Sequence, residues 1–530
     1  MKVLEEVSKL RNKKINKIEK LKEEQKALDF WNDFETICSG KYEDLTEVHG
    51  KHLLKCFGIY DKGSSDSFTI RIRIPLGQLT QEQASKFSQV AYKYGKSTID
   101  LTTRSQMEFR HLNLHELPIV LKELESVGIT TFQTAGDNFR GVITSPFDGY
   151  SKTSLITCED LIQDIHDVFL KNEEYIGTLP RKFNTGILGD TVNDCNIFGQ
   201  DCAFVLASKD DELGFNLYLG GKVGVQARPL NLFISPNQVK LTFKTIVDLF
   251  KKYGFRDNRN KNRITYFLDE IGIEEFEKAI IETSALPLKT AGELLVKDEY
   301  KIDKSATIKL KDNKTAVYFP IPSGIFNSKD LHCVTILMDE TNSILRLTNE
   351  QSFFLIAKDE FVQRIKEFQI FKKYDSYHNV YFNNQIACAG ANECSFGVIA
   401  NKSDAINMAI YLNQYVPIED AKIRMYWSAC PKGCGVHGVA DIGFEGAKAK
   451  DENGEFCDSV KIFIGGKATT SIQEARQLSK AIPIAKAQEV TKELLTIYKN
   501  ERINNESFEN FDSRVLSFLT IEEIQQRVGL

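Results

Sequence analysis

The chain has 530 residues, a formal net charge of −5, and 42% hydrophobic and 27% charged residues. This length allows roughly two to four domains, and the composition is typical of a globular enzyme or a large binding protein. The charge gives no general reason to expect nucleic-acid binding. No apolar run is long enough to span a bilayer, so we expect no membrane association.

The N-terminal segment, residues 1–31, is charged throughout and lacks the apolar stretch of a signal peptide. Its apolar residues recur at near-helical spacing, which predicts one amphipathic helix packed on the body; they are Leu4, Val7, Ile15, Ile18 and Leu21. We therefore expect a cytoplasmic protein, and disulfides are rare in that compartment.

A long internal repeat organises the rest of the chain. The strand-like order "FTIRIRIPLG", "IDLTTRSQMEF", "LGFNLYLGG" recurs as "AVYFPIPSG", "LRLTNEQSFFL", "VKIFIGG". Ile74 and Ile321 differ by 247 positions, and Leu101 and Leu347 by 246. A period this long does not indicate a solenoid. It predicts two related halves with a pseudo-twofold axis and a ligand at their seam.

Helical patterns lie between these strands, as in "QEQASKFSQVAYKYG" and "ELPIVLKELESVG". The expected fold class is α+β, a duplicated unit with mixed or antiparallel sheets flanked by helices. The first predicted strand alternates apolar residues with Thr69, Arg71 and Arg73. Such a cationic strand face is most often simply solvated.

Four cysteines form two tight pairs in "IACAGANECSFG" and "WSACPKGCGVHGVADIGF". Cys388 and Cys394 differ by six positions, and Cys430 and Cys434 by four. Structural zinc sites usually use tighter Cys-x2-Cys hooks, so the spacing favours an iron–sulfur cluster; zinc or no metal at all remain alternatives. The eleven cysteines do not resemble a disulfide framework. The other seven are expected to be buried apolar residues.

The second cysteine motif, read with the C-x5-C pair before it, resembles the signature of the nitrite and sulfite reductase family, which carries sirohaem and a four-iron cluster. The resemblance covers nearly the whole chain, because that family is itself built from a duplicated half. It implies that Cys388, Cys394, Cys430 and Cys434 bind a [4Fe-4S] cluster. It also implies that Cys434 bridges to the sirohaem iron. His437 is expected to be a packing or hydrogen-bonding residue.

The same resemblance assigns roles to basic residues, as an anionic macrocycle and a small-anion substrate require. Arg71 and Arg140 match the substrate-binding arginines, and Arg104 matches an arginine that holds the carboxylates of the macrocycle. Lys182 and Asn184, in "LPRKFN", match residues that line the distal face. For Arg73, Arg110 and Arg181 we expect structural roles. The repeat places Glu350 where the first half has Arg104, so one half would keep the anion chemistry.

Asn184 favours nitrite over sulfite, since the family's sulfite-type motif has a second lysine there and sulfite, largely dianionic, benefits from a further cation. The resemblance thus implies six-electron reduction of nitrite to ammonia, with sulfite reduction to sulfide as the alternative. No full nucleotide-binding motif is present, so electrons must come from another protein. Ferredoxin is the expected donor and a flavoprotein the alternative. The basic segment 250–263 could receive an acidic ferredoxin, although a solvated loop is the simpler interpretation.

The repeat and the motifs together divide the chain into five expected segments. They are an N-terminal helical extension (1–66), a first ferredoxin-like half-domain (67–136), a sirohaem-binding domain (137–305), a second ferredoxin-like half-domain (306–374) and a [4Fe-4S]/sirohaem domain (375–530). Two rival classes remain at this point: a zinc-binding interaction protein and a four-iron electron carrier without sirohaem.

Overall fold

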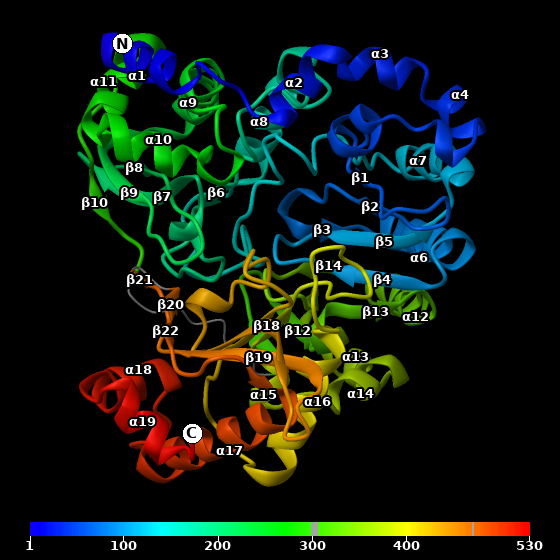
Figure 1. Ribbon diagram of the computed structural model, residues 1–530, viewed down its shortest axis with the longest axis vertical. Coiled ribbons are helices and arrows are strands. Elements are labelled where there is room, and N and C mark those ends of the chain that lie inside the picture. Colours follow the sequence, from blue (N-terminus) through cyan, green and yellow to red (C-terminus); the bar gives the residue numbers. More distant parts are fainter. Residues whose placement is uncertain (298–305, 469–470) are drawn as a thin grey trace.

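The computed structural model describes residues 1–297, 306–468 and 471–530. Within these ranges the chain forms four large sheets, each covered by helices, and one two-stranded ribbon, β20 (Lys467–Ala468) with β21 (Ile472–Gln473) (Figure 1). Two sheets are antiparallel and two are mixed. The expected α+β class with duplicated halves is confirmed.

The two antiparallel sheets each borrow an edge strand from the other half. The first has the order β1 (Ile59–Tyr60), β2 (Phe68–Arg71), β5 (Met107–Leu112), β4 (Thr98–Leu101), β13 (Ile325–Asn327). The other has the order β11 (Thr307–Lys309), β12 (Lys314–Phe319), β15 (Phe353–Lys358), β14 (Ile344–Leu347), β3 (Gln78–Leu79). Strand β13 therefore completes the first-half sheet, and β3 completes the second-half sheet.

Equivalent tight turns lead into the two exchanged strands. Gly77 and Gly324, 247 positions apart, have φ values of 65° and 67°, which favour glycine. A Cβ atom on Gly77 would lie 2.9 Å from the carbonyl oxygen of Leu347, and one on Gly324 would lie 2.9 Å from that of Leu101. The close approach of the halves is thus reciprocal, as a pseudo-twofold axis requires.

Two equivalent helices, α6 (Gln81–Tyr94) and α12 (Ser328–Thr341), pack against each other between the halves. Thr80 caps α6 by accepting a hydrogen bond from the Gln83 amide at 3.2 Å, and Gly95 is the C-cap residue that follows the helix. One core cluster joins both sheets to these helices. Its outer helices include α7 (Leu117–Glu125), α13 (Val362–Glu367) and α14 (Gln369–Asp375).

The two mixed sheets carry parallel strand pairs at one end. In the first half β6 (Thr185–Leu188) runs parallel to β7 (Cys202–Lys209), followed by antiparallel β8 (Glu212–Leu219) and β9 (Arg228–Ile234), with β10 (Glu293–Leu294) at the edge. In the second half β16 (Gln385–Ala387), β17 (Met425–Ser428) and β18 (Ile442–Lys450) are parallel neighbours. Strand β19 (Phe456–Ile464) then pairs with β18, β22 (Arg476–Gln477) and β23 (Ile482–Pro483).

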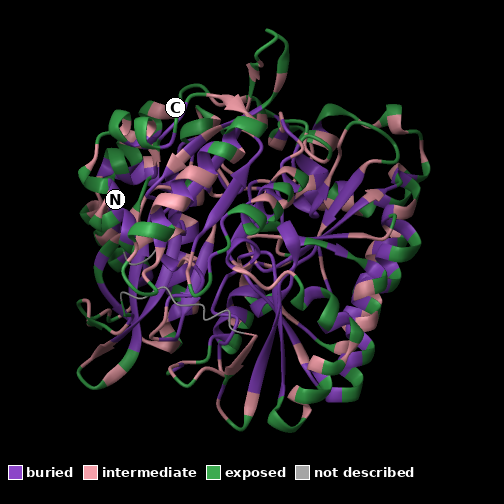
Figure 2. Ribbon diagram, turned by 90° about the horizontal axis from the view of Figure 1, so that it is seen from below, coloured by how far each residue is buried: buried purple, intermediate pink, exposed green. Residues whose placement is uncertain are grey.

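Helices pack against these mixed sheets, and across the molecule buried residues are concentrated in the inner strands while exposed residues lie on outer helices and loops (Figure 2). The first-half helices are α8 (Glu159–Phe169), α9 (Val239–Tyr253), α10 (Ile264–Ile271) and α11 (Ile273–Ser284). The second-half helices are α15 (Val380–Asn383), α16 (Lys402–Tyr415), α17 (Ile484–Glu501), α18 (Phe508–Arg514) and α19 (Ile521–Arg527). Among the described residues, no helix combines the length and hydrophobicity needed to cross a bilayer.

The single N-terminal helix predicted from the sequence is wrong, because the chain forms α1 (Lys2–Arg11) and α2 (Lys17–Glu24) with a break between them. The side chain of Asn16 accepts a hydrogen bond from the Ile18 amide at 2.9 Å and so starts α2 separately. Leu4 packs into the first-half mixed-sheet core, and Leu21 into the shared core. Short helices follow: α3 (Ala27–Asn32), α4 (Phe34–Ser39) and α5 (Leu54–Cys56).

Candidate functional site

The predicted cluster cysteines lie where two parallel strands end. Cys388 follows β16 directly, and Cys430 lies two residues past β17. Because the carboxyl ends of parallel strands meet at one edge of a sheet, both loops start side by side. The Ala429 amide donates a hydrogen bond to Cys388 Sγ at 3.2 Å, and Asn401 Nδ2 lies 3.5 Å from the same sulfur. Such donors stabilise a thiolate.

The four thiols lie close enough to influence one another. Burial raises the pKa of Cys388, and the nearby Cys434 and Cys430 raise it further. Burial likewise raises the pKa of Cys430, with contributions from Cys434 and Cys394. Within the described ranges, however, no three His, Cys, Asp or Glu side chains are gathered tightly enough to hold a single ion.

All eleven cysteines are free, which excludes a disulfide scaffold. Five of the remaining seven are buried as expected: Cys38, Cys56, Cys158, Cys195 and Cys202. Cys333 and Cys457 are partly exposed, contrary to expectation; Cys333 lies on α12 and Cys457 on the β18–β19 hairpin. His437 is buried with Nε2 3.4 Å from Glu445, in agreement with a packing and hydrogen-bonding role.

Arg71 ends β2 and has a side chain that is 24% exposed. Its Nε donates a hydrogen bond to Glu108 Oε1 at 2.8 Å. Burial alone would lower the pKa of Arg71, but Glu108 and the nearby Cys434 help to outweigh burial, and the pKa is raised. The structure thus brings the predicted anion-binding arginine of the first half close to a predicted cluster cysteine of the second.

Arg140 and Arg104 add positive charge that the surrounding protein does not neutralise. Arg140 donates hydrogen bonds to the carbonyl oxygens of Thr134 and Gly136, and Arg104 donates to that of Gly141 at 2.6 Å. Burial and then the charge of Arg140 lower the pKa of Arg104 to about 9. The Nε atoms of both arginines are buried without a hydrogen-bond partner among the described residues. A buried guanidinium group without a carboxylate partner favours a bound anion, which fits the roles expected of Arg104 toward the carboxylates of sirohaem and of Arg140 toward the substrate anion.

Lys182 and Asn184 precede β6 and are both partly exposed. Burial and the neighbouring Arg263 lower the pKa of Lys182 to about 7. Cys434 acts on Lys182 in the opposite direction, which puts this lysine near the same cysteine as Arg71. The backbone N–H of Asn184 donates a hydrogen bond to Asp201 Oδ2 at 2.9 Å, and its side chain makes no hydrogen bond within the described part of the chain.

The three arginines expected to be structural make protein contacts. Arg73 is buried over the ring of Phe139, 4.6 Å from its centroid. Arg110 pairs with two acids of its own sheet, and Arg181 lies 3.7 Å from Asp137. Glu350, the counterpart of Arg104, accepts a hydrogen bond from the Tyr426 hydroxyl at 2.9 Å.

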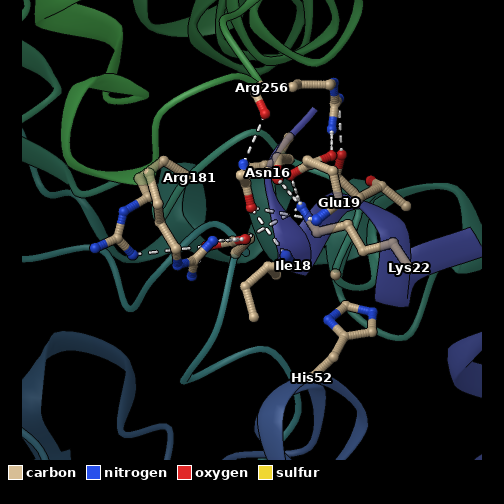
Figure 3. A network of polar contacts seen from close by, with 12 residues as sticks. Asn16, Ile18, Glu19, Lys22, His52, Arg181 and Arg256 are labelled. Carbon is tan, nitrogen blue, oxygen red and sulfur yellow. Dashed lines mark hydrogen bonds and ion pairs between the residues drawn. The ribbon is translucent and has the colours of Figure 1, made fainter. Parts of the chain in front are cut away.

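Asp137 was missed by sequence reasoning although it lies in the motif "GDNFRG" beside Arg140. Its carboxylate, 1% exposed, accepts two hydrogen bonds from Arg259 at 2.7 and 2.8 Å and lies 3.1 Å from Lys22 of α2. Figure 3 shows Lys22 and Arg181 reaching this network from the N-terminal helix and from the loop before Lys182. The one signal in the motif was its position three residues before Arg140.

The basic segment 250–263 offers fewer free charges than its sequence suggests. Arg256 pairs with Glu19, Arg259 with Asp137, and Arg263 with Asp201 at 2.7 Å. These arginines tie loops to the body, which agrees with the simpler interpretation of this segment rather than with a landing surface.

Comparison with known proteins agrees with this arrangement. The family description "Nitrite and sulphite reductase 4Fe-4S domain" matches residues 135–288 and 382–515, and "Nitrite/Sulfite reductase ferredoxin-like half domain" matches residues 60–127. The ferredoxin–nitrite reductase of Synechococcus elongatus is 31% identical over 86% of this chain and 91% of its own length. That of Leptolyngbya laminosa is 29% identical over 91% and 96%.

A solved structure gives the same fold. The NirA protein of Mycobacterium tuberculosis superposes with a TM-score of 0.87, covering 97% of this chain and 98% of its own, at 19% identity. The chain therefore belongs to the nitrite and sulfite reductase family, whose cofactors, a [4Fe-4S] cluster and sirohaem, it shares.

Proposed function

We propose that the protein reduces nitrite to ammonia with six electrons from ferredoxin. The observation that carries this proposal is the match to ferredoxin–nitrite reductases along most of the chain, 86% and 91% for the two relatives above. Asn184 supports nitrite over sulfite, because it keeps hydrogen-bonding capacity at the site without a further charge. Sulfite reduction by the same fold remains the second candidate.

The roles of the site residues belong to the same proposal. Cys388, Cys394, Cys430 and Cys434 would hold the cluster, with Cys434 shared between the cluster and the sirohaem, and Arg104 would bind carboxylates of the macrocycle. When bound, these cofactors supply electrons to the substrate one at a time. Support comes from the converging loops of the four cysteines and from the unpaired Nε atom of Arg104.

Arg71, Arg140 and Lys182 bind the substrate oxygens and stabilise the negative charge that develops on them. Arginine is a poor proton donor because it stays charged at neutral pH. A lysine whose pKa is about 7 can instead give up a proton near the working pH. We therefore assign proton delivery to the Lys182 ammonium, with Asn184 orienting the anion by hydrogen bonding.

The location, the alternative donor and the division of the chain belong to the same proposal. A cytoplasmic location agrees with eleven free cysteines. A flavoprotein is the alternative electron donor. The five-segment division stands as proposed above; its 137–305 segment ends in residues 298–305, which lie outside the described residues.

One preparation tests the function. Purified holoprotein should show a Soret band and a red-shifted α band, and should form ammonia from nitrite with reduced ferredoxin or methyl viologen. A colourless preparation, or cluster absorption alone, contradicts it in favour of the zinc-binding or simple electron-carrier class. A kcat/KM for sulfite above that for nitrite would transfer the assignment to sulfite reduction.

A further inference from the structure

We propose that Glu108 is a positioning residue for Arg71, and that a buried chain of ion pairs anchors Glu108 to the cysteine-bearing half of the molecule. The inference rests on the proposed role of Arg71 in binding the substrate anion. It assigns a function to acidic residues that no sequence motif singles out.

The contact between Glu108 and Arg71 fixes one edge of the guanidinium group. The two residues are direct partners across the β2–β5 ladder. Oε1 of Glu108 lies 2.8 Å from Nε and 2.7 Å from Nη2 of Arg71. On the other edge, Nη1 makes a long contact of 3.4 Å to the Thr134 carbonyl, its one hydrogen bond among the described residues, and the group lies 5.2 Å from the centroid of the Tyr60 ring. Glu108 thus sets the plane of the group while leaving hydrogens available for an anion.

The second oxygen of Glu108 continues the chain. Arg110 lies two residues further along β5, so its side chain is on the same face of the sheet, and it donates a hydrogen bond to Glu108 Oε2 at 2.8 Å. Arg110 also pairs with Asp100, whose Oδ1 lies 2.8 Å from Lys402 Nζ. From Glu108 to Lys402, each side chain is 9% exposed or less. Because positive and negative charges alternate, removing one charge leaves each neighbour buried with one ionic partner fewer.

The far end of this chain lies beside the cluster cysteines. Lys402 begins α16, and the preceding Asn401 donates a hydrogen bond to the Cys388 carbonyl at 2.8 Å. On a second side, Glu393 lies next to Cys394 and 3.8 Å from Arg110. The chain therefore crosses from the half that carries Arg71 to the half that carries the thiols, and holds the two in register.

The other half of the molecule shows that the sheet does not need these charges. At the repeat offsets of 246 and 247 positions, Phe354 replaces Glu108 and Tyr318 replaces Arg71. Those two aromatic residues are also direct strand partners, with ring centroids 5.0 Å apart. The same sheet is thus built without the ion pair where no anion site is proposed, which separates the role of Glu108 from folding.

The test compares Glu108→Gln with Asp512→Asn in cofactor-loaded protein. Asp512 lies on α18, and its carboxylate, 3% exposed, pairs with Arg476 of β22 at 3.0 Å. Its replacement therefore removes a buried carboxylate from an ion pair that is not part of the chain from Glu108 to Lys402. Nitrite affinity is measured by titrating the Soret band, alongside KM, kcat and thermal unfolding.

We expect Glu108→Gln to lower kcat/KM for nitrite by about 10- to 100-fold, mainly through a higher KM, with weaker binding in the Soret titration. Asp512→Asn should keep the wild-type KM. Glu108→Asp should recover part of the loss, because it restores the charge. If Glu108→Gln keeps wild-type nitrite affinity and KM, while losing as much thermal stability as Asp512→Asn, the positioning role is wrong.

Two further comparisons cover the cases in which Glu108→Gln does not take up cofactors or the protein does not reduce nitrite. If Glu108→Gln does not take up cofactors, Asp100→Asn, two links away, should raise KM in the same direction, and an unchanged KM there overturns the proposal. If wild-type protein turns over sulfite and not nitrite, the proposed function fails, but the same variants compared with sulfite still decide whether Glu108 positions Arg71.

Discussion

Arg104 and Glu350 occupy equivalent positions, 246 residues apart, and make opposite contacts. Arg104 donates to the Gly141 carbonyl at 2.6 Å and to Gln200 at 2.9 Å, whereas Glu350 accepts from the Tyr426 hydroxyl. Two copies of one fold thus carry reversed charge at the same place. The unpaired positive charge of the candidate site is therefore concentrated in the first copy.

Replacing Cys434 by serine should remove the cluster absorption, because a serine hydroxyl is a poor ligand for iron compared with a thiolate. The measurement is the visible spectrum together with iron and sulfide content. Cys333→Ser is the matched control, since this partly exposed thiol lies on α12 away from the four cysteines. A Cys434→Ser protein with full iron content would contradict the ligand assignment.

Replacing Lys182 by alanine should lower kcat for nitrite by about 100-fold, the usual range for loss of a general acid, while the Soret and α bands stay unchanged. Steady-state rates and the spectrum of the same preparation check this. Lys182→Arg keeps the charge but not the proton delivery, so it should keep nitrite affinity better than kcat. Equal rates for wild type and Lys182→Ala would refute the proton-delivery role.

Replacing Asn184 by lysine should shift selectivity toward sulfite, because the added charge favours a dianion over a monoanion. We expect the ratio of kcat/KM for sulfite to that for nitrite to rise by about tenfold. This corresponds to a change of about 1.4 kcal/mol in the free energy that discriminates the two anions. Competition assays with both anions measure this ratio. Asn184→Gln, which adds length without charge, serves as the control and should leave the ratio nearly unchanged.

The free energy of unfolding should fall in mild acid because His52 is buried in the folded protein. It is 5% exposed, and burial with the nearby Lys22 lowers its pKa from 6.5 to about 4. Between these values the unfolded chain binds the proton and the folded chain does not, so stability falls as the pH drops below about 6.5. From pH 7.5 to pH 5 this contribution amounts to about 2 kcal/mol.

Denaturant unfolding of His52→Gln at both pH values checks this expectation. Between pH 7.5 and pH 5 the free energy of unfolding of the variant should fall by about 2 kcal/mol less than that of the wild type. His332→Gln, at an exposed position of α12, is the control, and its free energy of unfolding should fall by as much as that of the wild type. An unchanged pH dependence in His52→Gln would show that other groups govern the acid response.

The repeat in the sequence predicted the two halves, because strands and turns leave local patterns that survive divergence. The helix α6 was predicted for the same reason, from the helical pattern "QEQASKFSQVAYKYG". The break before α2 was not anticipated, since Asn16 interrupts an apolar spacing that continues across it. Local signals in this chain overrule periodicity.

The candidate site was predictable only where residues form motifs. The cysteines and Lys182 lie in recognisable short segments, and the structure brings their loops toward one another. Glu108 and Asp137 could not be found in this way, because their significance comes from partners far away in the chain. Long-range ion pairs leave no local trace in a single sequence.

The exchange of β3 and β13 means that neither half is a self-sufficient unit. Cut apart, each fragment would display the bare backbone edge of β4 or β14, a template on which other chains can add strands. The two halves therefore depend on each other for a complete sheet, and we expect a separated half to aggregate rather than to fold as a smaller enzyme.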